Sequence, residues 1–346
     1  ACTVGSAPDA IALIFGTADP ADRDGEVVVR LATRIVLSPH VAARLASALR
    51  EALGRRDAPD APSGSRPPHA GPAPRFLLPA PSESVAAARA LLGLVRGLET
   101  PFGLERSFKM SPGSLKANRF LVTMHKGAIK GAAAERIPTI CERLQMPEPL
   151  RAVLDARLPE ATYVHFGFED AGGGFLFKAY LEFWSTWEHE LSRRAADPAP
   201  FLLHLGLKWD PSRPGRAAVT RYICHPLLTV EGIRRRLSEI YPEPAVAAPR
   251  TAVEAVLARV AARLDPHRVL YVEATEEGNP RRSFDVNVYR ARLRVQDVDP
   301  CLLPLRAHYA LPDAAFRRVY EPARPLPLGH IAGGLDRQGR DFLTVY

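Results

Sequence analysis

The chain has 346 residues, of which 47% are hydrophobic, and its 46 Lys and Arg residues outnumber its 38 Asp and Glu residues to give a formal net charge of +8. This composition is typical of a globular protein and excludes long disordered or collagen-like structure. No apolar run approaches the roughly 18 to 20 residues of a membrane span, and the apolar stretch at 11–15 is too short for the core of a signal peptide. We therefore expect a cytoplasmic protein without membrane partners.

The positive charge and the cysteines narrow the choice of partners and sites. An excess of Lys and Arg suggests an anionic partner, but the chain has no basic tail and no zinc-finger or RNA-recognition motif, so nucleic acid is unlikely. A phosphorylated small molecule fits a modest positive excess equally well. None of the four cysteines belongs to a C-x-x-C pair, so neither a disulfide framework nor a zinc ribbon is indicated; they are Cys2, Cys141, Cys224 and Cys301.

The prolines are distributed unevenly along the chain, and their main cluster marks a boundary between domains. Eight of the 33 prolines lie between Pro59 and Pro81, in a segment without apolar periodicity that is typical of an extended linker. We therefore expect a small domain at 1–55, a Pro-rich linker at 56–81 and a larger domain at 82–346.

The small N-terminal domain is expected to follow a β-β-α order. Residues 11–15 and 26–37 have strand composition, and turn residues at 21–25 join them. A Ser-Pro pair then marks the start of a helix at 38–53. The pattern, which includes the segment RIVLSPH, is similar to a small uncharacterised bacterial domain family and implies no chemistry of its own. Recruitment of a partner protein is one role open to it.

The larger domain alternates predicted helices with pairs of predicted strands. Apolar residues at helical spacing, proline breaks and a capping box formed by Thr251 and Glu254 predict helices at 85–98, 139–144, 149–158, 229–241 and 251–264. Runs of β-branched and aromatic residues predict strand pairs at 104–110 with 119–124, 163–168 with 175–184, 202–209 with 217–224, 269–275 with 284–295, and 328–335 with 342–346. Turn sequences such as DAGGG and EEGNP join several pairs. Five hairpins punctuated by helices amount to an internal repeat.

The second strand of four hairpins places a polar residue and a tyrosine on one face. Side chains alternate between the two faces of a strand, so Lys178 and Tyr180 point to one side while the residues between them point to the other. The same spacing recurs as Thr220-x-Tyr222, Asn287-x-Tyr289 and Thr344-x-Tyr346. The opposite faces are apolar enough to pack beneath helices. A sheet with one dry face and one polar, aromatic face most naturally closes around a chamber. We therefore predict an α+β fold, an antiparallel ten-stranded β-barrel ringed by helices.

With this pattern, residues 100–346 resemble the aromatic prenyltransferases of the dimethylallyltryptophan synthase type, whose α-β-β-α repeats wrap an antiparallel barrel (the ABBA fold). The segment TPFGLERSF resembles the first strand of that family and implies that Glu105 is the catalytic base. The segment NRFLVT implies that Arg119 binds diphosphate, and FKAYL matches the family's Lys-x-Tyr motif. Asn287 with Tyr289 matches a Gln-x-Tyr position, and Tyr346 a closing tyrosine.

The resemblance implies a metal-independent transferase of secondary metabolism without a cofactor, which moves an allylic group from its diphosphate to an indole or phenol in a small molecule or peptide. The sequence departs from the family pattern at the third hairpin, where Ala218-x-Thr220-x-Tyr222 stands in place of the family's Arg-x-Lys-x-Tyr. Lys208 on the preceding strand could replace one of the missing charges. The implied diphosphate ligands are Arg119, Lys178, Lys208 and Asn287. The tyrosines that would shield an allylic cation are Tyr180, Tyr222, Tyr289 and Tyr346. The sequence has no DDxxD-like cluster that would hold Mg²⁺ against a diphosphate.

The same residues also allow a reading without catalysis. Glu105 could be a solvated carboxylate, and Arg119 and Lys178 could pair with carboxylates inside a barrel. His165 and Glu169 share a strand face but lack a third ligand, so no metal site is expected. The alternative to a transferase is therefore a non-catalytic barrel that binds an apolar ligand, with the N-terminal domain recruiting a partner.

Overall fold

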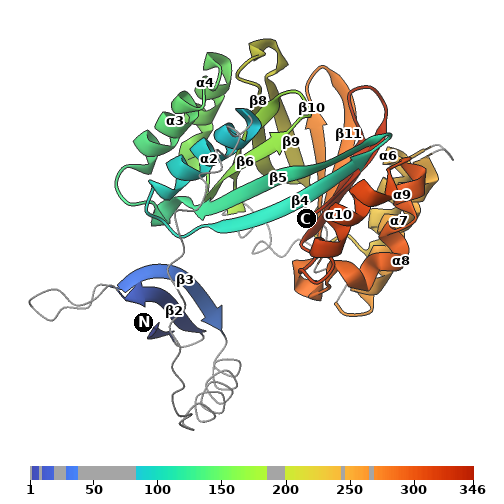
Figure 1. Ribbon diagram of the computed structural model, residues 1–346, viewed down its shortest axis with the longest axis horizontal. Coiled ribbons are helices and arrows are strands. Elements are labelled where there is room, and N and C mark those ends of the chain that lie inside the picture. Colours follow the sequence, from blue (N-terminus) through green and yellow to red (C-terminus); the bar gives the residue numbers. More distant parts are fainter. Residues whose placement is uncertain are drawn as a thin grey trace, which may run out of the picture. The chain divides into compact units, whose positions relative to one another are not determined.

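The chain divides into two compact units, Ala1–Ala80 and Pro81–Tyr346. The computed structural model describes three strands of the first unit and, in the second, residues 83–184, 199–242, 246–264 and 269–346 (Figure 1). In the first unit, β1 (Cys2–Ala7), β2 (Ala10–Ala18) and β3 (Val29–Leu37) pair antiparallel in that order.

Two of these three strands were expected from the sequence. The predicted strands at 11–15 and 26–37 correspond to β2 and β3, whereas β1 was not predicted. The turn at 21–25, the helix at 38–53 and the linker at 56–81 lie outside the described residues. The three-domain division therefore stays a prediction.

The second unit is built on a closed antiparallel barrel of ten strands, in the order β10-β11-β12-β13-β4-β5-β6-β7-β8-β9. Each predicted strand pair is one hairpin of this barrel, so the predicted fold class is confirmed. The strands are β4 (Gly103–Ser111), β5 (Ser114–His125), β6 (Tyr163–Asp170), β7 (Phe175–Glu182), β8 (Phe201–Trp209), β9 (Ala218–Cys224), β10 (Leu270–Glu276), β11 (Asn279–Asn287), β12 (His330–Leu335) and β13 (Asp341–Val345).

Helices cover the outside of the barrel in two groups (Figure 1). The first group packs on β5 to β8, and its apolar cluster includes Leu91, Ile140, Leu154, Phe166 and Leu207. It consists of α2 (Glu83–Arg96), α3 (Ala133–Arg143) and α4 (Glu148–Arg157). The second group packs on β10 to β13 and β4. It consists of α6 (Val230–Ile240), α7 (Ala247–Ala261), α8 (Asp299–Leu302), α9 (Leu305–His308) and α10 (Asp313–Ala323).

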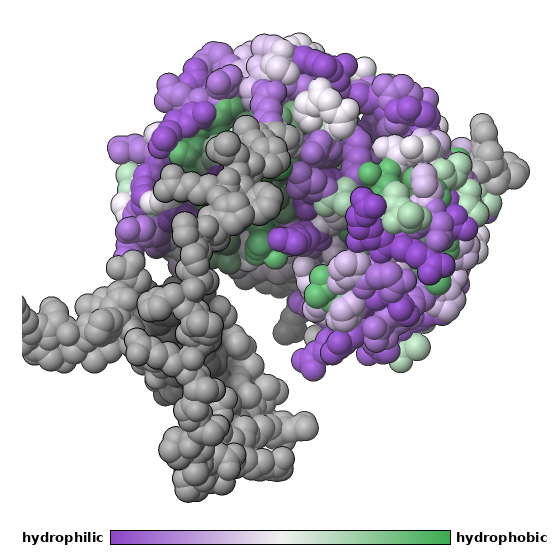
Figure 2. All heavy atoms as spheres, in the orientation of Figure 1, coloured by the Kyte–Doolittle hydropathy of each residue, from purple (hydrophilic) through white to green (hydrophobic). Residues whose placement is uncertain are grey.

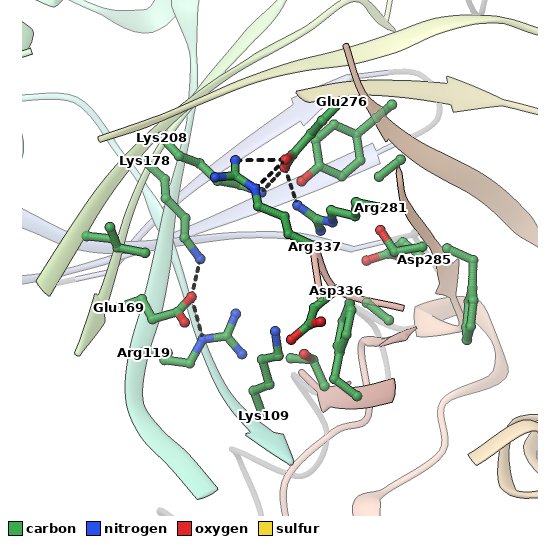
Figure 3. A pocket seen from close by; sticks show the side chains of 18 of the residues that line it. Lys109, Arg119, Glu169, Lys178, Lys208, Glu276, Arg281, Asp285, Asp336 and Arg337 are labelled. Atoms are coloured by element: carbon green, nitrogen blue, oxygen red, sulfur yellow. Dashed lines mark hydrogen bonds and ion pairs between the residues drawn. The ribbon is translucent and has the colours of Figure 1, made fainter. Parts of the chain in front are cut away.

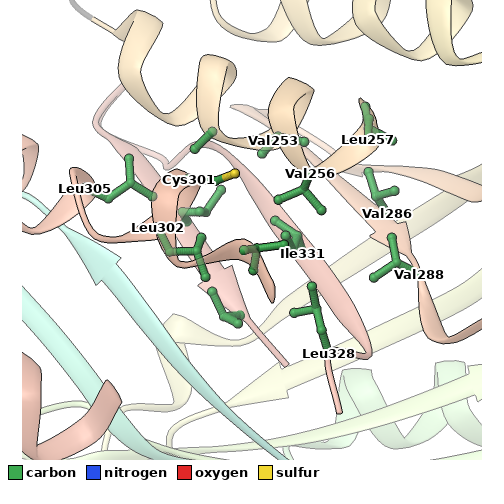
Figure 4. Close-up of a cluster of buried hydrophobic side chains, with 14 of the residues drawn as sticks. Val253, Val256, Leu257, Val286, Val288, Cys301, Leu302, Leu305, Leu328 and Ile331 are labelled. Atoms are coloured by element: carbon green, nitrogen blue, oxygen red, sulfur yellow. The ribbon is translucent and has the colours of Figure 1, made fainter. Parts of the chain in front are cut away.

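The second apolar cluster joins residues that are far apart along the chain. Figure 4 shows Val256 of α7, Val286 of β11, Leu302 of α8 and Ile331 of β12 packed together. Helices α8 to α10 were not predicted: α8 and α9 have four residues each, too few for a clear helical period, whereas α10 has 11 residues and was missed. The face shown in Figure 2 is mostly hydrophilic over the helices, as expected where apolar side chains are buried beneath them. In the described residues no helix is both long and apolar enough to span a membrane.

Several predicted element boundaries are wrong. Helix α7 begins at Ala247 rather than Thr251, so Thr251 lies inside the helix and the predicted capping box does not form. Helix α3 begins at Ala133 and continues through Pro138, whereas the prediction started at 139. Strand β11 starts at Asn279 and ends at Asn287, and a 3-10 turn (Tyr289–Ala291) replaces the rest of the predicted strand. The early end of β11 matters for function, because it moves Tyr289 off the sheet.

Trp209 links the barrel to the first helix group. Its side chain is fully buried and its indole N–H donates to the carbonyl oxygen of Leu144 at 2.8 Å. Replacing Trp209 with Phe should lower the free energy of unfolding by about 2–4 kcal/mol, because it leaves a cavity and a buried carbonyl without a partner. Chemical denaturation followed by circular dichroism measures this. Leu326→Ala, at a side chain that is 51% exposed, should stay within about 0.5 kcal/mol of the wild type. An equal effect of both changes would contradict the assigned role of Trp209.

Candidate functional site

The described residues enclose two cavities inside the barrel, one toward each end of the inner face. The first, here called the cationic chamber, has a volume of about 460 Å³ and is lined by seven basic and four acidic side chains. The second, here called the apolar chamber, has a volume of about 490 Å³ and is lined by apolar side chains that include Leu121, Trp184 and Val272. Four residues line both chambers: Tyr180, Tyr222, Asp285 and Tyr346.

Strand alternation explains which side chains reach the chambers. On β7, Lys178, Tyr180 and Glu182 point inward, whereas Phe177 and Ala179 are buried beneath the first helix group. The predicted inner face of this strand is therefore the one that the structure shows.

Two glutamates organise the bases of the cationic chamber (Figure 3). Glu169 on β6 lies 2.6 Å from Lys178 and 3.3 Å from Arg119. Glu276 on β10 forms ion pairs with Lys208 at 3.5 Å, Arg281 at 2.6 Å and Arg337 at 2.8 Å. Each glutamate holds several cations close together and leaves an excess of positive charge facing the cavity.

Two cations at the floor of this chamber have donors that are not fully satisfied. Arg119 is 8% exposed; its Nε makes an ion pair with Glu169 at 3.3 Å but no hydrogen bond, and its terminal nitrogen Nη1 makes no hydrogen bond. Lys109 points into the cavity (Figure 3), and its ammonium lies 3.8 Å from the centre of the Phe342 ring. In the described residues Lys109 has no ion pair with a carboxylate. Buried donors without partners are rare in folded proteins, so an anionic ligand is the natural occupant.

Burial and repulsion between neighbouring cations lower the pKa values of the lysines in this chamber. Burial is the main cause that lowers the pKa of Lys109 to about 7 and that of Lys178 to about 8. Burial also lowers the pKa of Lys208 well below its ordinary value, and Arg281 adds to this effect. Burial opposes the charge of Arg119 as well, but Glu169 and Tyr346 outweigh it and raise the pKa of that guanidinium. A multiply charged anion would therefore restore charge to the lysines as it binds.

A layer of tyrosines separates the chambers. The rings of Tyr180 and Tyr222 meet edge to face with their centres 5.8 Å apart, and the Arg119 guanidinium lies 6.0 Å from the centre of the Tyr346 ring. Gly206 on β8 makes room for this layer, because a Cβ atom there would come within 2.9 Å of both the Tyr180 and the Tyr222 ring. Three of the four tyrosines that the sequence suggested thus lie between the two cavities.

Glu105 lies in the apolar chamber and is held by groups from distant parts of the chain. Tyr289 donates its hydroxyl to Glu105 Oε1 at 2.9 Å, and His330 Nε2 lies 3.8 Å from the same oxygen. His330 Nδ1 is 2.9 Å from Asp285. Gly329 permits this packing, because any Cβ at that position would overlap the Tyr289 ring. Glu105 is therefore a fixed group of the chamber and not a solvated surface carboxylate.

One group of side chains in the described residues could hold a metal ion. Ligand atoms of His165, Glu182 and His204 lie within 4.8 Å of one another on three adjacent strands. His165 already makes hydrogen bonds of 2.8 Å to Thr123 and to Glu182. Burial lowers the pKa of His204 to about 4, so its imidazole is neutral at pH 7. The group was not foreseen as a cluster, because His165 was compared only with Glu169, which belongs to the other chamber.

The structure brings most of the predicted site residues together. Arg119, Lys178 and Lys208 share the cationic chamber, and Lys208 lies directly opposite Ala218 in the pairing of β8 and β9. Lys208 is therefore in place to supply a charge that Ala218 lacks. Asn287 is an exception, because it lies in the apolar chamber with its amide 3.4 Å from His330 and not among the cations. Its expected role as a diphosphate ligand does not fit this position.

Sequence reasoning missed four cations of the chamber, Lys109, Arg216, Arg281 and Arg337. Two of them could have been found by alternation. Lys109 follows Glu105 by four residues on β4, and Arg281 precedes Asp285 by four on β11. The predicted strand at 284–295 began too late to include Arg281. Arg337 lies in the turn between β12 and β13, where alternation does not apply.

Comparison with known proteins supports the fold. No protein-family model and no curated protein sequence matches the chain. The chain is similar to the solved structure of the prenyltransferase PriB in a ternary complex with L-tryptophan and dimethylallyl thiolodiphosphate, with a TM-score of 0.52 and 17% identity over 77% of this chain and 90% of that chain.

Two further solved structures match with lower TM-scores. A 6-dimethylallyltryptophan synthase from Micromonospora olivasterospora is 14% identical over 76% of this chain and 94% of its own, with a TM-score of 0.46. AnaPT from Neosartorya fischeri is 10% identical over 70% of this chain and 77% of its own, with a TM-score of 0.46. The likeness to PriB confirms the expected barrel fold of this chain.

Proposed function

We propose that this protein transfers an allylic prenyl group from its diphosphate to an electron-rich aromatic acceptor, an indole or a phenol in a small molecule or peptide. One observation carries the proposal: a cluster of buried cations, whose positive charge exceeds that of the carboxylates beside them, faces a cavity that a layer of tyrosines separates from a second cavity with a fixed carboxylate. The PriB complex, which holds L-tryptophan and dimethylallyl thiolodiphosphate, is consistent with two such substrates in one barrel.

The diphosphate would bind in the cationic chamber without a metal ion. Arg119 offers a buried N–H that makes no hydrogen bond, Lys109 offers an ammonium that faces the cavity, and Lys178, Lys208 and Arg281 add charge around them. Charge-assisted hydrogen bonds of this kind stabilise the negative charge that a leaving diphosphate gains.

Ionisation would occur at the tyrosine layer. The C–O bond of the allylic diphosphate breaks, its electron pair stays with the diphosphate, and an allylic cation remains. Tyr180, Tyr222 and Tyr346 line both chambers, and each cation–π contact contributes about 0.5–2 kcal/mol. The rings also exclude water, which would otherwise capture the cation.

The acceptor would bind in the apolar chamber, beside Glu105. The aromatic ring attacks the allylic cation and forms the new bond, and Glu105 accepts the N–H or O–H proton of the acceptor. The chamber suits this step, because apolar walls can hold an aromatic ring. Its three acidic side chains, Glu105, Glu182 and Asp285, also outnumber its two charged basic ones, Arg290 and His330.

Turnover with defined substrates tests the proposal. The purified chain is incubated with dimethylallyl diphosphate and a panel of indoles and phenols, in buffer with a chelator and in buffer with Mg²⁺. Mass spectrometry should detect an acceptor that carries one dimethylallyl group in both buffers. Binding of the diphosphate without any product would instead support the non-catalytic barrel, and product only with Mg²⁺ would contradict metal independence.

A further inference from the structure

A line of charged groups runs along the wall of the apolar chamber, and the proposed function gives a part in proton transfer only to its last member, Glu105. Asp285 on β11 lies 2.9 Å from His330 Nδ1, and His330 on β12 lies 3.8 Å from Glu105 on β4. The line starts at Asp285, which also faces the cationic chamber.

The His330 ring is held from several sides. Its centre lies 5.2 Å from that of Tyr289 at an interplanar angle of 89°, and 5.6 Å from that of Tyr346. The Tyr346 N–H donates to the carbonyl oxygen of His330 at 3.1 Å, which ties the backbone of the two residues together. Together with the contact to Asp285, this packing leaves the imidazole little freedom to rotate.

The neighbours of His330 favour its charged form. Burial opposes the charge, but Asp285 outweighs it and, with Glu105 and Glu182, raises the pKa of His330 to about 9. The other groups that face the ring, Tyr289, Tyr346 and the amide of Asn287, carry no charge at neutral pH. At pH 7 a fixed imidazolium therefore lies between the carboxylates of Asp285 and Glu105.

Both contacts of Glu105 fall on the same carboxylate oxygen. Tyr289 donates to Oε1, and His330 is paired with Oε1. In the described residues no hydrogen bond reaches Oε2 of Glu105, so that oxygen is left for a substrate. When one oxygen of a carboxylate base is held by its neighbours, the orientation of its second oxygen is fixed as well.

We infer that His330, fixed by Asp285, is a positioning residue that holds the Glu105 carboxylate in place for the acceptor. This inference rests on the proposed function, because it concerns the base of that reaction. With one imidazolium between two carboxylates, the line carries a net negative charge on the acceptor side of the tyrosine layer. The line therefore orients Glu105, and its net negative charge still attracts the allylic cation.

The variants His330→Gln and Asp285→Asn test this role. Glutamine is a polar side chain that carries no charge, so it removes the ion pair with Glu105, and kcat at pH 7.5 should fall by about tenfold or more, while KM for the prenyl diphosphate changes little. In the wild type kcat should fall above about pH 9, where His330 loses its proton. This decrease in kcat at high pH should be absent from His330→Gln and should occur at lower pH in Asp285→Asn.

An imidazole NMR titration of the resting protein gives a readout that does not need turnover. The signal assigned by its loss in His330→Gln should titrate near pH 9 in the wild type and at lower pH in Asp285→Asn. His308→Gln is the matched control, since His308 pairs with Asp341 at 2.7 Å and lines neither chamber; it should keep the wild-type kcat and pH profile.

Different outcomes separate the two proposals. If the wild type forms no prenylated product, the proposed function fails and this role fails with it. If the wild type turns over and His330→Gln keeps both the wild-type kcat and its decrease above about pH 9, only the positioning role is overturned. A His330 that titrates near pH 6.5 would overturn the positioning role in the same way. Should His330→Gln not fold, Asp285→Asn with the NMR titration decides between these outcomes.

Discussion

Replacing Glu105 with Gln should reduce kcat for prenyl transfer by about 10²- to 10⁴-fold, the usual contribution of a general base. The amide oxygen can still accept the hydrogen bond that Tyr289 now donates to the carboxylate at 2.9 Å. It cannot take a proton from the acceptor. The fold and the cationic chamber should be unchanged, since Glu105 does not line that chamber.

Three measurements make this prediction specific. Steady-state kinetics give kcat, calorimetry with a thiolodiphosphate analogue gives the affinity of the cationic chamber, and phosphate analysis gives the rate of diphosphate release without transfer. Glu135→Gln, an exposed carboxylate on α3, is the matched control and should behave as the wild type. A Glu105→Gln variant with more than about a tenth of the wild-type kcat would exclude Glu105 as the general base.

Raising the pH from 7 to 9 should weaken the binding of an allylic thiolodiphosphate by about tenfold or more, because each proton that must be taken up on binding changes the affinity by up to about tenfold per pH unit. The pKa of Lys109 is about 7 and that of Lys178 about 8 in the empty chamber. A bound anion favours the charged ammonium groups and raises both pKa values. Affinity is therefore highest below pH 7, and it falls as the pH rises through the pKa values of the empty chamber.

Calorimetry in buffers with different ionisation enthalpies counts the protons directly. At pH 8 the wild type should take up close to one proton or more as the analogue binds. Lys109→Met should bind more weakly at pH 7 and show a shallower pH dependence, because one of the titrating groups is gone. Equal affinity at pH 7 and 9, or a Lys109→Met variant as steep as the wild type, would show that Lys109 does not contact the diphosphate.

The faces of the strands could be predicted from local sequence. A side chain on a strand points to the side opposite its neighbours whatever the rest of the chain does. That rule places Lys178 and Tyr180 on the inner face of β7, and the apolar residues that alternate with them beneath helices. Applied to four hairpins, it was enough to predict a closed barrel with a polar, aromatic interior, and three of its four tyrosines lie between the two cavities. Arg119 was suggested only by the resemblance to the prenyltransferase family.

The height of each residue along the barrel depends on the assembled fold. Strands in a barrel are tilted and staggered by amounts that no single strand encodes. Asn287 and Arg281 lie on the same strand and the same face, yet they line different chambers. The joining of Asp285, His330 and Glu105 likewise needs four neighbouring strands, β11, β12, β13 and β4, brought into register from distant parts of the chain. Alternation along a strand is a local property of the backbone, whereas stagger and ion pairing between strands are properties of the closed sheet.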